Sequence, residues 1–189
     1  MISAILLAAG ESKRMNGENK LTKNINGEPL IKHAVKNILE SSVDELIIVV
    51  GHRSDEIRKI ININNKIKFI YNNNYKSGMA SSIKSGINNL SERTESFLIC
   101  LADMPMINKE IYNQIIKHSK SKEIVMPTYK SKQGNPILFS ISMKDMIMNI
   151  EGDNGAKKIL ENNKEKIFEV EINNEGILKN YNTLNNFGI

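Results

Sequence analysis

The apolar start of the chain leads into a loop that is rich in glycine and basic residues. Residues 6–20 read LLAAGESKRMNGENK, with Gly10, Arg14 and Lys20 spaced along the loop. Gly10 permits a tight turn whose exposed backbone N–H groups can bind phosphate oxygens, and Arg14 and Lys20 add positive charge. The loop matches neither G-x-x-x-x-G-K-[ST] nor G-x-G-x-x-G, which excludes two common phosphate-binding motifs. By itself it fits a solvated basic turn as well as a phosphate site.

An aspartate follows the most hydrophobic segment of the chain. The residues FLICLA, at 97–102, lead directly into Asp103. An aspartate at the end of a buried strand can hold Mg²⁺ against a triphosphate, because Mg²⁺ takes one or two protein carboxylates and completes its octahedron with water and phosphate oxygens. The sequence DMP that starts at Asp103 also fits a turn or a helix N-cap, so a structural role is the alternative.

The pattern of apolar residues predicts the elements that position this loop and Asp103. Short apolar runs alternate with segments of helical period, and this order predicts a mostly parallel sheet with helices on both faces. Ligands of such sheets bind beyond the carboxyl ends of the strands, where residues 8–20 fall. We expect strands at 4–9, 45–51, 66–71 and 97–102, and helices over 29–42 and 79–90 and around 57–61 and 111–116.

Helical spacing also predicts which side chains face the sheet. Residues 79–90 place Met79, Ile83, Ile87 and Leu90 on one face, which we expect to point inward. The apolar face of the helix at 29–42 consists of Leu30, Ile31, Ala34, Val35, Ile38 and Leu39.

The last third of the chain is less regular. The alternating residues 167–172 predict a strand that we expect to pair antiparallel. No repeat, linker or low-complexity tail interrupts the sequence, so we expect a single domain over 1–189. Further strands are predicted at 123–127 and 136–140, and short helices at 143–150 and 154–162.

Composition limits the class of partner. The 189 residues carry a formal net charge of +5 and a pI of about 9.2, which suits an anionic ligand. The lysines are spread along the chain, aromatic residues make up 5%, and no nucleic-acid-binding motif is present, so we expect no nucleic-acid partner. The one cysteine, Cys100, excludes an internal disulfide and lies in an apolar run that favours a core position. With no secretory pattern and no apolar run near the ~20 residues of a membrane span, we expect a cytoplasmic protein without a membrane partner.

Residues 6–21, LLAAGESKRMNGENKL, resemble the signature of the nucleotidyltransferases related to those that complete the molybdenum cofactor. That signature begins L-A-A-G or L-A-G-G and continues with R-M-G and then K. The loop wraps a triphosphate in the family, so the resemblance implies that Arg14 and Lys20 contact phosphate. Asn16 stands where the family usually has glycine, and we expect a loop one residue longer. The nucleotide contacts implied for the start of the loop are Leu7, Ala8, Ala9 and Gly10.

The residues LADMP at 101–105 resemble the metal-binding segment of the same family, which makes Asp103 the leading Mg²⁺ ligand. Such enzymes often place a second ligand near the C-terminus, within D-x-D-T-P. Residues 180–184 read NYNTL, with Asn180 and Asn182 in place of the aspartates. An asparagine carbonyl can ligate Mg²⁺ but brings no charge. The resemblance therefore implies Asp103 and Asn182 as metal ligands, and leaves the choice between Asn180 and Asn182 open.

Residues 75–87, YKSGMASSIKSGI, resemble the family's G-M-x-x-S-[LI]-x-x-G helix start. Gly78 lets the backbone approach a ligand, and Ser81 and Ser82 come at the start of the helix. The resemblance implies hydrogen bonds from these serines to a nucleobase edge or ribose, with Ser82 as the better match. N-capping by one serine is the alternative.

Two later segments resemble the cytidylyltransferase branch of the family. Residues 127–140, PTYKSKQGNPILFS, are similar to P-x-Y-x-G-x-x-G-H-P-V-L-F-S, with matches at Gly134 and Pro136 and with Asn135 in place of histidine. Residues 151–160, EGDNGAKKIL, match G-D-x-G-A-[RK]-x-L-L. The resemblance implies that these residues, with Asp153 and Gly155, face the acceptor substrate. Asp153 also fits a helix cap.

Together these matches imply one Rossmann-like α/β nucleotidyltransferase domain, with 1–107 mainly binding nucleotide and 108–189 mainly binding acceptor. The implied reaction transfers CMP from CTP to molybdopterin, releases pyrophosphate, and depends on Mg²⁺, Arg14, Lys20 and Asp103. A phosphate acceptor is already ionised, so no general base is expected. A molybdenum hydroxylase is the implied recipient of the cofactor. Transfer from GTP, transfer to a sugar or polyol phosphate, and a non-catalytic nucleotide-binding maturation protein are the alternatives.

Overall fold

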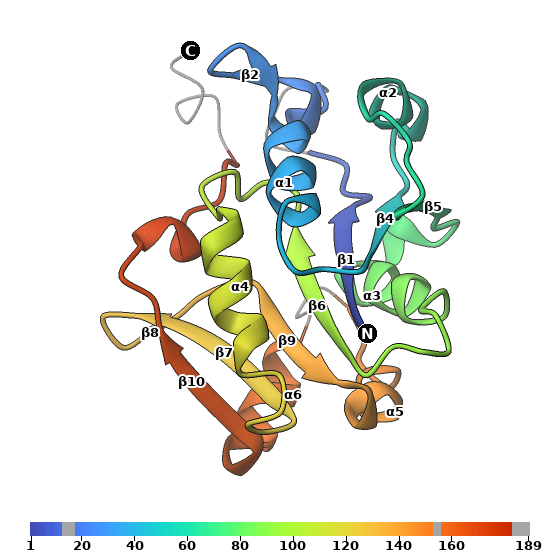
Figure 1. Cartoon of the computed structure of the whole chain (residues 1–189). Helices are drawn as coiled ribbons and strands as arrows, with labels where there is room; N and C mark the ends of the chain where they lie inside the picture. Colours follow the sequence, from blue (N-terminus) through green and yellow to red (C-terminus); the bar gives the residue numbers. More distant parts are fainter. Residues whose placement is uncertain (13–17, 153–155, 183–189) are drawn as a thin grey trace.

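The computed structural model describes residues 1–12, 18–152 and 156–182 (Figure 1). An eight-stranded sheet has the order β10-β7-β9-β6-β1-β4-β5, with β8 paired to β7, and β2 and β3 form a separate hairpin. The strands are β1 Ile2–Ala8, β2 Asn24–Ile25, β3 Glu28–Pro29, β4 Glu45–Val50, β5 Ile67–Tyr71, β6 Ser96–Leu101, β7 Ile124–Tyr129, β8 Lys132–Gln133, β9 Ile137–Ser140 and β10 Ile167–Glu171. The helices are α1 Leu30–Leu39, α2 Ser54–Ile60, α3 Met79–Ile87, α4 Lys109–Lys117, α5 Lys144–Ile147 and α6 Lys157–Asn162. Short 3₁₀ helices are η1 Lys20–Thr22, η2 Tyr75–Ser77, η3 Ile141–Met143, η4 Lys164–Lys166 and η5 Glu175–Leu178.

The centre of the sheet is parallel, as the sequence predicts. β1 pairs in parallel with β4 and β6, and β4 pairs in parallel with β5. Successive residues of β1 point to opposite faces, and Ala4, Ile5 and Leu6 are all fully buried. An uninterrupted apolar run is therefore required here, because helices cover both faces of the strand.

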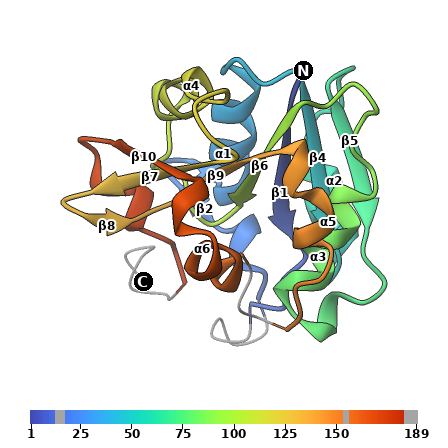
Figure 2. The same cartoon turned by 90° about the horizontal axis from the view of Figure 1, so that it is seen from below.

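Helices cover the two faces of the sheet in separate layers (Figure 2). Leu6 contributes to a core with α1, α2 and α4, whereas Ile5 contributes to a core with α3, α5 and α6. None of the helices within the described residues is long and apolar enough to cross a membrane. The result is a three-layer α/β architecture with mostly parallel strands, in agreement with the predicted fold class.

The expected antiparallel pairing of residues 167–172 is wrong. β10 pairs in parallel with β7, with Ile167 opposite Ile124. The antiparallel members of the sheet are instead β9, which pairs with β6 and β7, and β8, which pairs with β7. Alternation of apolar and polar residues reports that one face of a strand is exposed, but carries no information on strand direction.

The inward face predicted for residues 79–90 is correct except at its first position. Ile83 and Ile87 are fully buried and Leu90 is half-buried, but Met79 is 38% exposed. Met79 lies in the first turn of α3, beside the edge of the sheet where a cavity opens. Helical period predicts the direction of a side chain around the helix axis, not how far the covered part of the sheet extends.

A glycine brings α3 close to the central strand. A Cβ on Gly86 would lie 2.3 Å from Cγ2 of Ile5, so only glycine permits this approach. Because α3 lies directly on β1, the N-terminal end of the helix comes next to the loop that follows β1.

Candidate functional site

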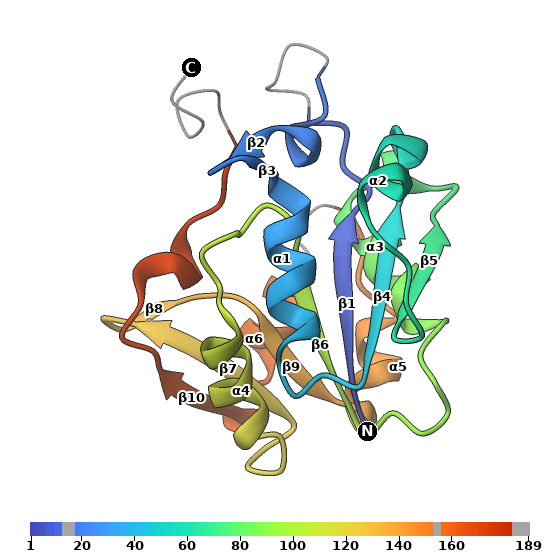
Figure 3. The same cartoon turned by 45° about the horizontal axis from the view of Figure 1, so that its top comes forward.

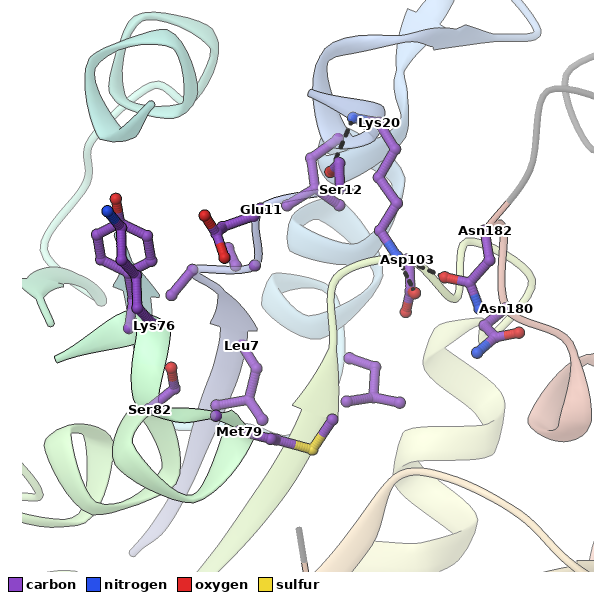
Figure 4. A pocket seen from close by; sticks show the side chains of 17 residues that line it. Leu7, Glu11, Ser12, Lys20, Lys76, Met79, Ser82, Asp103, Asn180 and Asn182 are labelled. Atoms are coloured by element: carbon purple, nitrogen blue, oxygen red, sulfur yellow. Dashed lines mark hydrogen bonds and ion pairs between the residues drawn. The ribbon is translucent and has the colours of Figure 1, made fainter. Parts of the chain in front are cut away.

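A cavity of about 400 Å³ opens where β1 and β6 end, and Figure 4 shows the side chains that line it. In Figure 3, β1 and β4 point toward the same edge of the sheet, where the chain continues into the loop with η1. Several separate segments supply the lining. These residues are Leu7, Ala8, Ala9, Gly10, Glu11, Ser12, Lys20, Leu21, Tyr75, Lys76, Gly78, Met79, Ser82, Leu101, Asp103, Asn180 and Asn182.

A lysine amine joins two of the predicted metal ligands on one side of this cavity. Nζ of Lys20 donates to Oδ2 of Asp103 at 2.5 Å and to Oδ1 of Asn182 at 2.6 Å (Figure 4). The side chains of Lys20 and Asp103 are 19% and 13% exposed, so water screens this ion pair less than a surface pair. The cavity therefore has one wall where positive and negative charge are held in contact.

Two hydrogen bonds within the loop after β1 hold the backbone around Lys20. The Asn19 side chain caps η1 by accepting a hydrogen bond from the backbone N–H of Leu21 at 3.1 Å. The backbone N–H of Lys20 donates to Oγ of Ser12 at 3.2 Å. These two bonds fix the backbone from which the Lys20 side chain reaches the cavity. Arg14 lies outside the described residues.

Asp103 also anchors the C-terminal segment through its backbone. The N–H of Ala102 donates to the carbonyl of Leu7 at 3.3 Å, which extends the contact between β6 and β1 beyond the last paired residues. The carbonyl of Asp103 accepts a hydrogen bond from the N–H of Tyr181 at 2.8 Å. Tyr181 lies between Asn180 and Asn182, so this bond brings both asparagines to the cavity.

The opposite side of the cavity comes from the start of α3. Gly78 precedes the helix with φ of 107° and ψ of 175°, a backbone conformation that favours glycine. Ser82 lines the cavity, whereas Ser81 does not and instead borders a separate hollow beside Asn72. The two predicted serines therefore point to different places.

Three of the residues predicted to face the acceptor, Gly134, Asn135 and Pro136, do not line this cavity. Gly134, Asn135 and Pro136 lie between β8 and β9, where the N–H of Asn135 donates to the carbonyl of Ile177 at 3.0 Å. A Cβ on Gly134 would meet the Ile177 side chain at 2.7 Å, which gives this glycine a packing role. Asp153 and Gly155 lie outside the described residues.

Residues 4–167 match the family model described as "MobA-like NTP transferase domain". The chain belongs to this family. It therefore contains a nucleotidyltransferase-family domain, as the resemblance of its loop to the family signature implies.

Curated relatives of this MobA-like domain include proteins with different names. The bifunctional protein GlmU of Staphylococcus saprophyticus is 24% identical over 143 residues, which cover 75% of this chain and 31% of GlmU. The probable molybdenum cofactor guanylyltransferase of Methanosarcina acetivorans is 25% identical over 154 residues, which cover 79% of this chain and 67% of that protein. The chain thus spans about a third of the length of the GlmU proteins that it matches.

Solved structures share the fold across nearly the whole chain. Rv0371c from Mycobacterium tuberculosis H37Rv superposes with a TM-score of 0.88 at 20% identity, covering 99% of this chain and 95% of that one. A structure of Rv0371c in complex with manganese superposes with a TM-score of 0.77 at 18% identity, covering 90% and 88%. At these identities the similarity shows the fold of the MobA-like domain and nothing finer.

The motifs did not single out several residues that line the cavity of this MobA-like chain. Tyr75 and Lys76 come from the segment that contains Gly78, and Lys76 brings a second lysine to the lining. Their only signal in the sequence is adjacency to the glycine before α3. Glu11 likewise directly follows Gly10. Within the described residues, no cluster of three or more His, Cys, Asp or Glu side chains could hold a metal ion.

Proposed function

We propose that this nucleotidyltransferase transfers CMP from CTP to molybdopterin and releases pyrophosphate, forming a cytosine dinucleotide cofactor. The observation that carries the proposal is the cavity at the carboxyl end of β1, which brings Lys20, Asp103 and Ser82 together. Each comes from a segment whose sequence resembles a nucleotide or metal contact of the family. Ligands bind at this edge in open α/β sheets.

The cavity has two chemically different ends that match the two ends of a nucleotide. Lys20 and Asp103 form the charged end, and Ser82 lies at the opposite side with Gly78 (Figure 4). The Lys20 ammonium suits the triphosphate, and the hydroxyl of Ser82 suits a base or ribose. The backbone from Ala8 to Gly10 lines the space between them.

The proposed reaction needs positioning and charge neutralisation from the protein. An acceptor phosphate oxygen attacks the α-phosphorus of CTP and forms a new P–O bond. The bond between the α-phosphorus and the oxygen that bridges it to the β-phosphorus breaks, and that oxygen leaves with pyrophosphate. The acceptor is ionised at neutral pH, so no side chain has to remove a proton. Lys20, with Arg14, would stabilise the charge that develops on the phosphates.

The residues present fit a divalent cation at the charged end. Oδ2 of Asp103 and Oδ1 of Asn182 both approach one cationic group, the Lys20 ammonium, within 2.6 Å. Carboxylate and amide oxygens are ligands that Mg²⁺ accepts, so Asp103 would hold Mg²⁺ with Asn182 as its neutral partner. When bound, Mg²⁺ would supply Lewis-acid neutralisation of phosphate charge.

The choice of CTP rests on resemblance. The L-A-A-G start at residues 7–10 and the later segments at 134–136 and 152–156 are similar to the cytidylyl branch. GTP is the second candidate, because the Methanosarcina acetivorans relative is named a guanylyltransferase. In this proposal residues 1–107 mainly bind nucleotide, residues 108–189 mainly bind acceptor, and a molybdenum hydroxylase receives the product.

Release of pyrophosphate tests the proposal. The protein would be incubated with Mg²⁺, with one of CTP, GTP, ATP and UTP, and with either molybdopterin or a sugar or polyol phosphate, and reactions without an acceptor would be the controls. We expect release with CTP only. Release with GTP in place of CTP would identify GTP as the nucleotide substrate, and release only with a sugar or polyol phosphate would identify that compound as the acceptor. Nucleotide binding without release would favour a non-catalytic maturation protein.

A further inference from the structure

We infer that Asn72 is a positioning residue that fixes the Ser82 hydroxyl as a hydrogen-bond donor toward the nucleoside end of the substrate. The inference rests on the proposed function, since it concerns the same cavity. It assigns a role to a residue outside the cavity lining, and it states the chemistry that the ligand must present to Ser82, namely an oxygen or nitrogen that accepts a hydrogen bond.

The Asn72 side chain is held in one orientation. Asn72 follows β5 directly, is 3% exposed, and donates from its backbone N–H to the carbonyl of Val50 at 2.8 Å. Its Oδ1 accepts a hydrogen bond from the backbone N–H of Asn74 at 2.9 Å. Because a backbone N–H can only donate, the oxygen of the amide must face Asn74, and the NH₂ group must face the other way.

The NH₂ group of Asn72 faces the two serines of α3. Nδ2 lies 2.8 Å from Oγ of Ser81 and 3.1 Å from Oγ of Ser82, and donates to both. An amide nitrogen carries two hydrogens and accepts none, so these two bonds use its capacity fully. Each serine therefore receives a hydrogen bond on its oxygen and keeps its own hydrogen for another partner.

The two serines differ in where that hydrogen goes. Oγ of Ser81 lies 2.9 Å from the carbonyl of Asn74 and 2.8 Å from the carbonyl of Gly78, and both can only accept. The Ser81 hydroxyl therefore donates its hydrogen to a backbone carbonyl of its own segment. For Ser82, the described residues show no acceptor for the hydroxyl hydrogen, and Ser82 is the serine that lines the cavity.

A donor at this position selects for an acceptor on the substrate. Leu7 and Met79 also line the cavity, so the Ser82 hydroxyl works in a partly apolar setting where an unmet hydrogen bond is costly (Figure 4). A carbonyl oxygen or unprotonated ring nitrogen of a base fits this requirement, and so does a ribose oxygen.

A double-mutant cycle on the full chain tests the inference. Asn72→Asp keeps the shape of the side chain but places an acceptor beside Ser82. The Ser82 hydroxyl would then donate its hydrogen to this carboxylate and could only accept a hydrogen bond from the ligand. We expect Asn72→Asp and Ser82→Ala each to weaken CTP binding by about threefold to tenfold in the presence of Mg²⁺. The double variant should bind no more weakly than Ser82→Ala alone, because Asn72 acts through Ser82.

Two controls separate this role from a general loss of stability. Asn163→Asp alters another buried asparagine, one that donates to the carbonyl of Ile159 and lies away from the cavity. It should lower the melting temperature without changing CTP affinity. Asn72→Ala removes the donor to Ser82 and should show the same pattern of CTP affinities, alone and combined with Ser82→Ala. It replaces Asn72→Asp if that variant does not fold.

The outcomes are distinct. A loss that differs between CTP and GTP supports a contact of Ser82 with the base, and an equal loss supports a contact with ribose. Additive losses in the double variant, or unchanged binding by Asn72→Asp, overturn the role of Asn72 and leave the proposed function intact. If the wild-type chain binds none of CTP, GTP, ATP and UTP, the proposed function and this inference both fail.

Discussion

The ammonium of Lys20 lies 2.5 Å from a carboxylate oxygen of Asp103, although 83 positions separate the two residues in the sequence. The same ammonium lies 2.6 Å from Oδ1 of Asn182. The oxygens that family resemblance assigns to a metal ion therefore already contact a cation of the chain itself, which neutralises the Asp103 carboxylate and donates to the Asn182 amide oxygen. We expect Lys20 and a divalent metal to compete for these oxygens until a triphosphate offers the ammonium another partner.

Asp103→Ala should abolish measurable turnover or lower it by at least about 100-fold, because both the metal ion and Lys20 would lose their charged partner. The measurement is pyrophosphate release with CTP and molybdopterin. Asp145→Ala, at an exposed position in α5, is the matched control and should keep the wild-type rate. Near-normal turnover by Asp103→Ala would contradict the metal assignment.

Lys20→Met should raise the affinity for Mn²⁺ alone while lowering the rate of nucleotidyl transfer. Without the ammonium, the dication no longer competes with a positive charge in contact with Asp103, and we expect about tenfold tighter binding at low ionic strength. Titration calorimetry of the nucleotide-free protein measures the change.

Lys66→Met is the control for the lysine variant, since Nζ of Lys66 donates to the carbonyl of Val43, away from the cavity. It should leave Mn²⁺ affinity unchanged. Weaker Mn²⁺ binding by Lys20→Met would show that Lys20 organises the two oxygens for the metal instead of competing with it.

Local sequence patterns were sufficient to predict the central part of the fold. The run 4–9 predicts a strand buried on both faces, and β1 at Ile2–Ala8 is such a strand. The pattern could not give the direction of β10, because an alternating segment has the same period in either direction. Met79 was misplaced for a similar reason, since helical period does not show where the sheet ends.

The candidate site could be predicted only where residues belong to a motif. Lys20 and Asp103 stand in such segments, and the structure brings them into contact. Asn72 carries no motif, and its relation to Ser82 depends on the end of β5 lying beside the start of α3. Contacts of this kind depend on tertiary packing, which the period of a single segment does not encode.

Stability should fall as the pH rises above about 8.5, through Cys100. Complete burial raises the pKa of the Cys100 thiol far above its ordinary value, and burial together with Cys100 raises the pKa of Tyr112. An unfolded cysteine ionises near pH 8.5, whereas the folded one stays neutral, so the unfolded state binds fewer protons above that pH. The stabilisation is complete below about pH 8.5 and is lost as the pH rises.

Urea unfolding at pH 8 and at pH 9.5 measures this dependence. Linkage predicts a loss of about 1 kcal/mol from Cys100 between these two pH values. Cys100→Ala should show a decrease that is smaller by this amount, with Tyr112 still contributing above about pH 10. An identical decrease in the wild type and the variant would contradict a buried neutral thiol.

Ala9→Gly should shift the nucleotide preference from CTP toward GTP. Ala9 is 4% exposed and lines the cavity, and its position is the one that distinguishes L-A-A-G from L-A-G-G. Removing its methyl group enlarges the cavity, which favours a larger base, and one such group changes discrimination by about tenfold. The ratio of kcat/KM for CTP and GTP is the measurement. Ala4→Gly makes the same change at the other end of β1, where it should lower stability and leave this ratio unchanged, so a shifted ratio in both variants would contradict a direct role of Ala9.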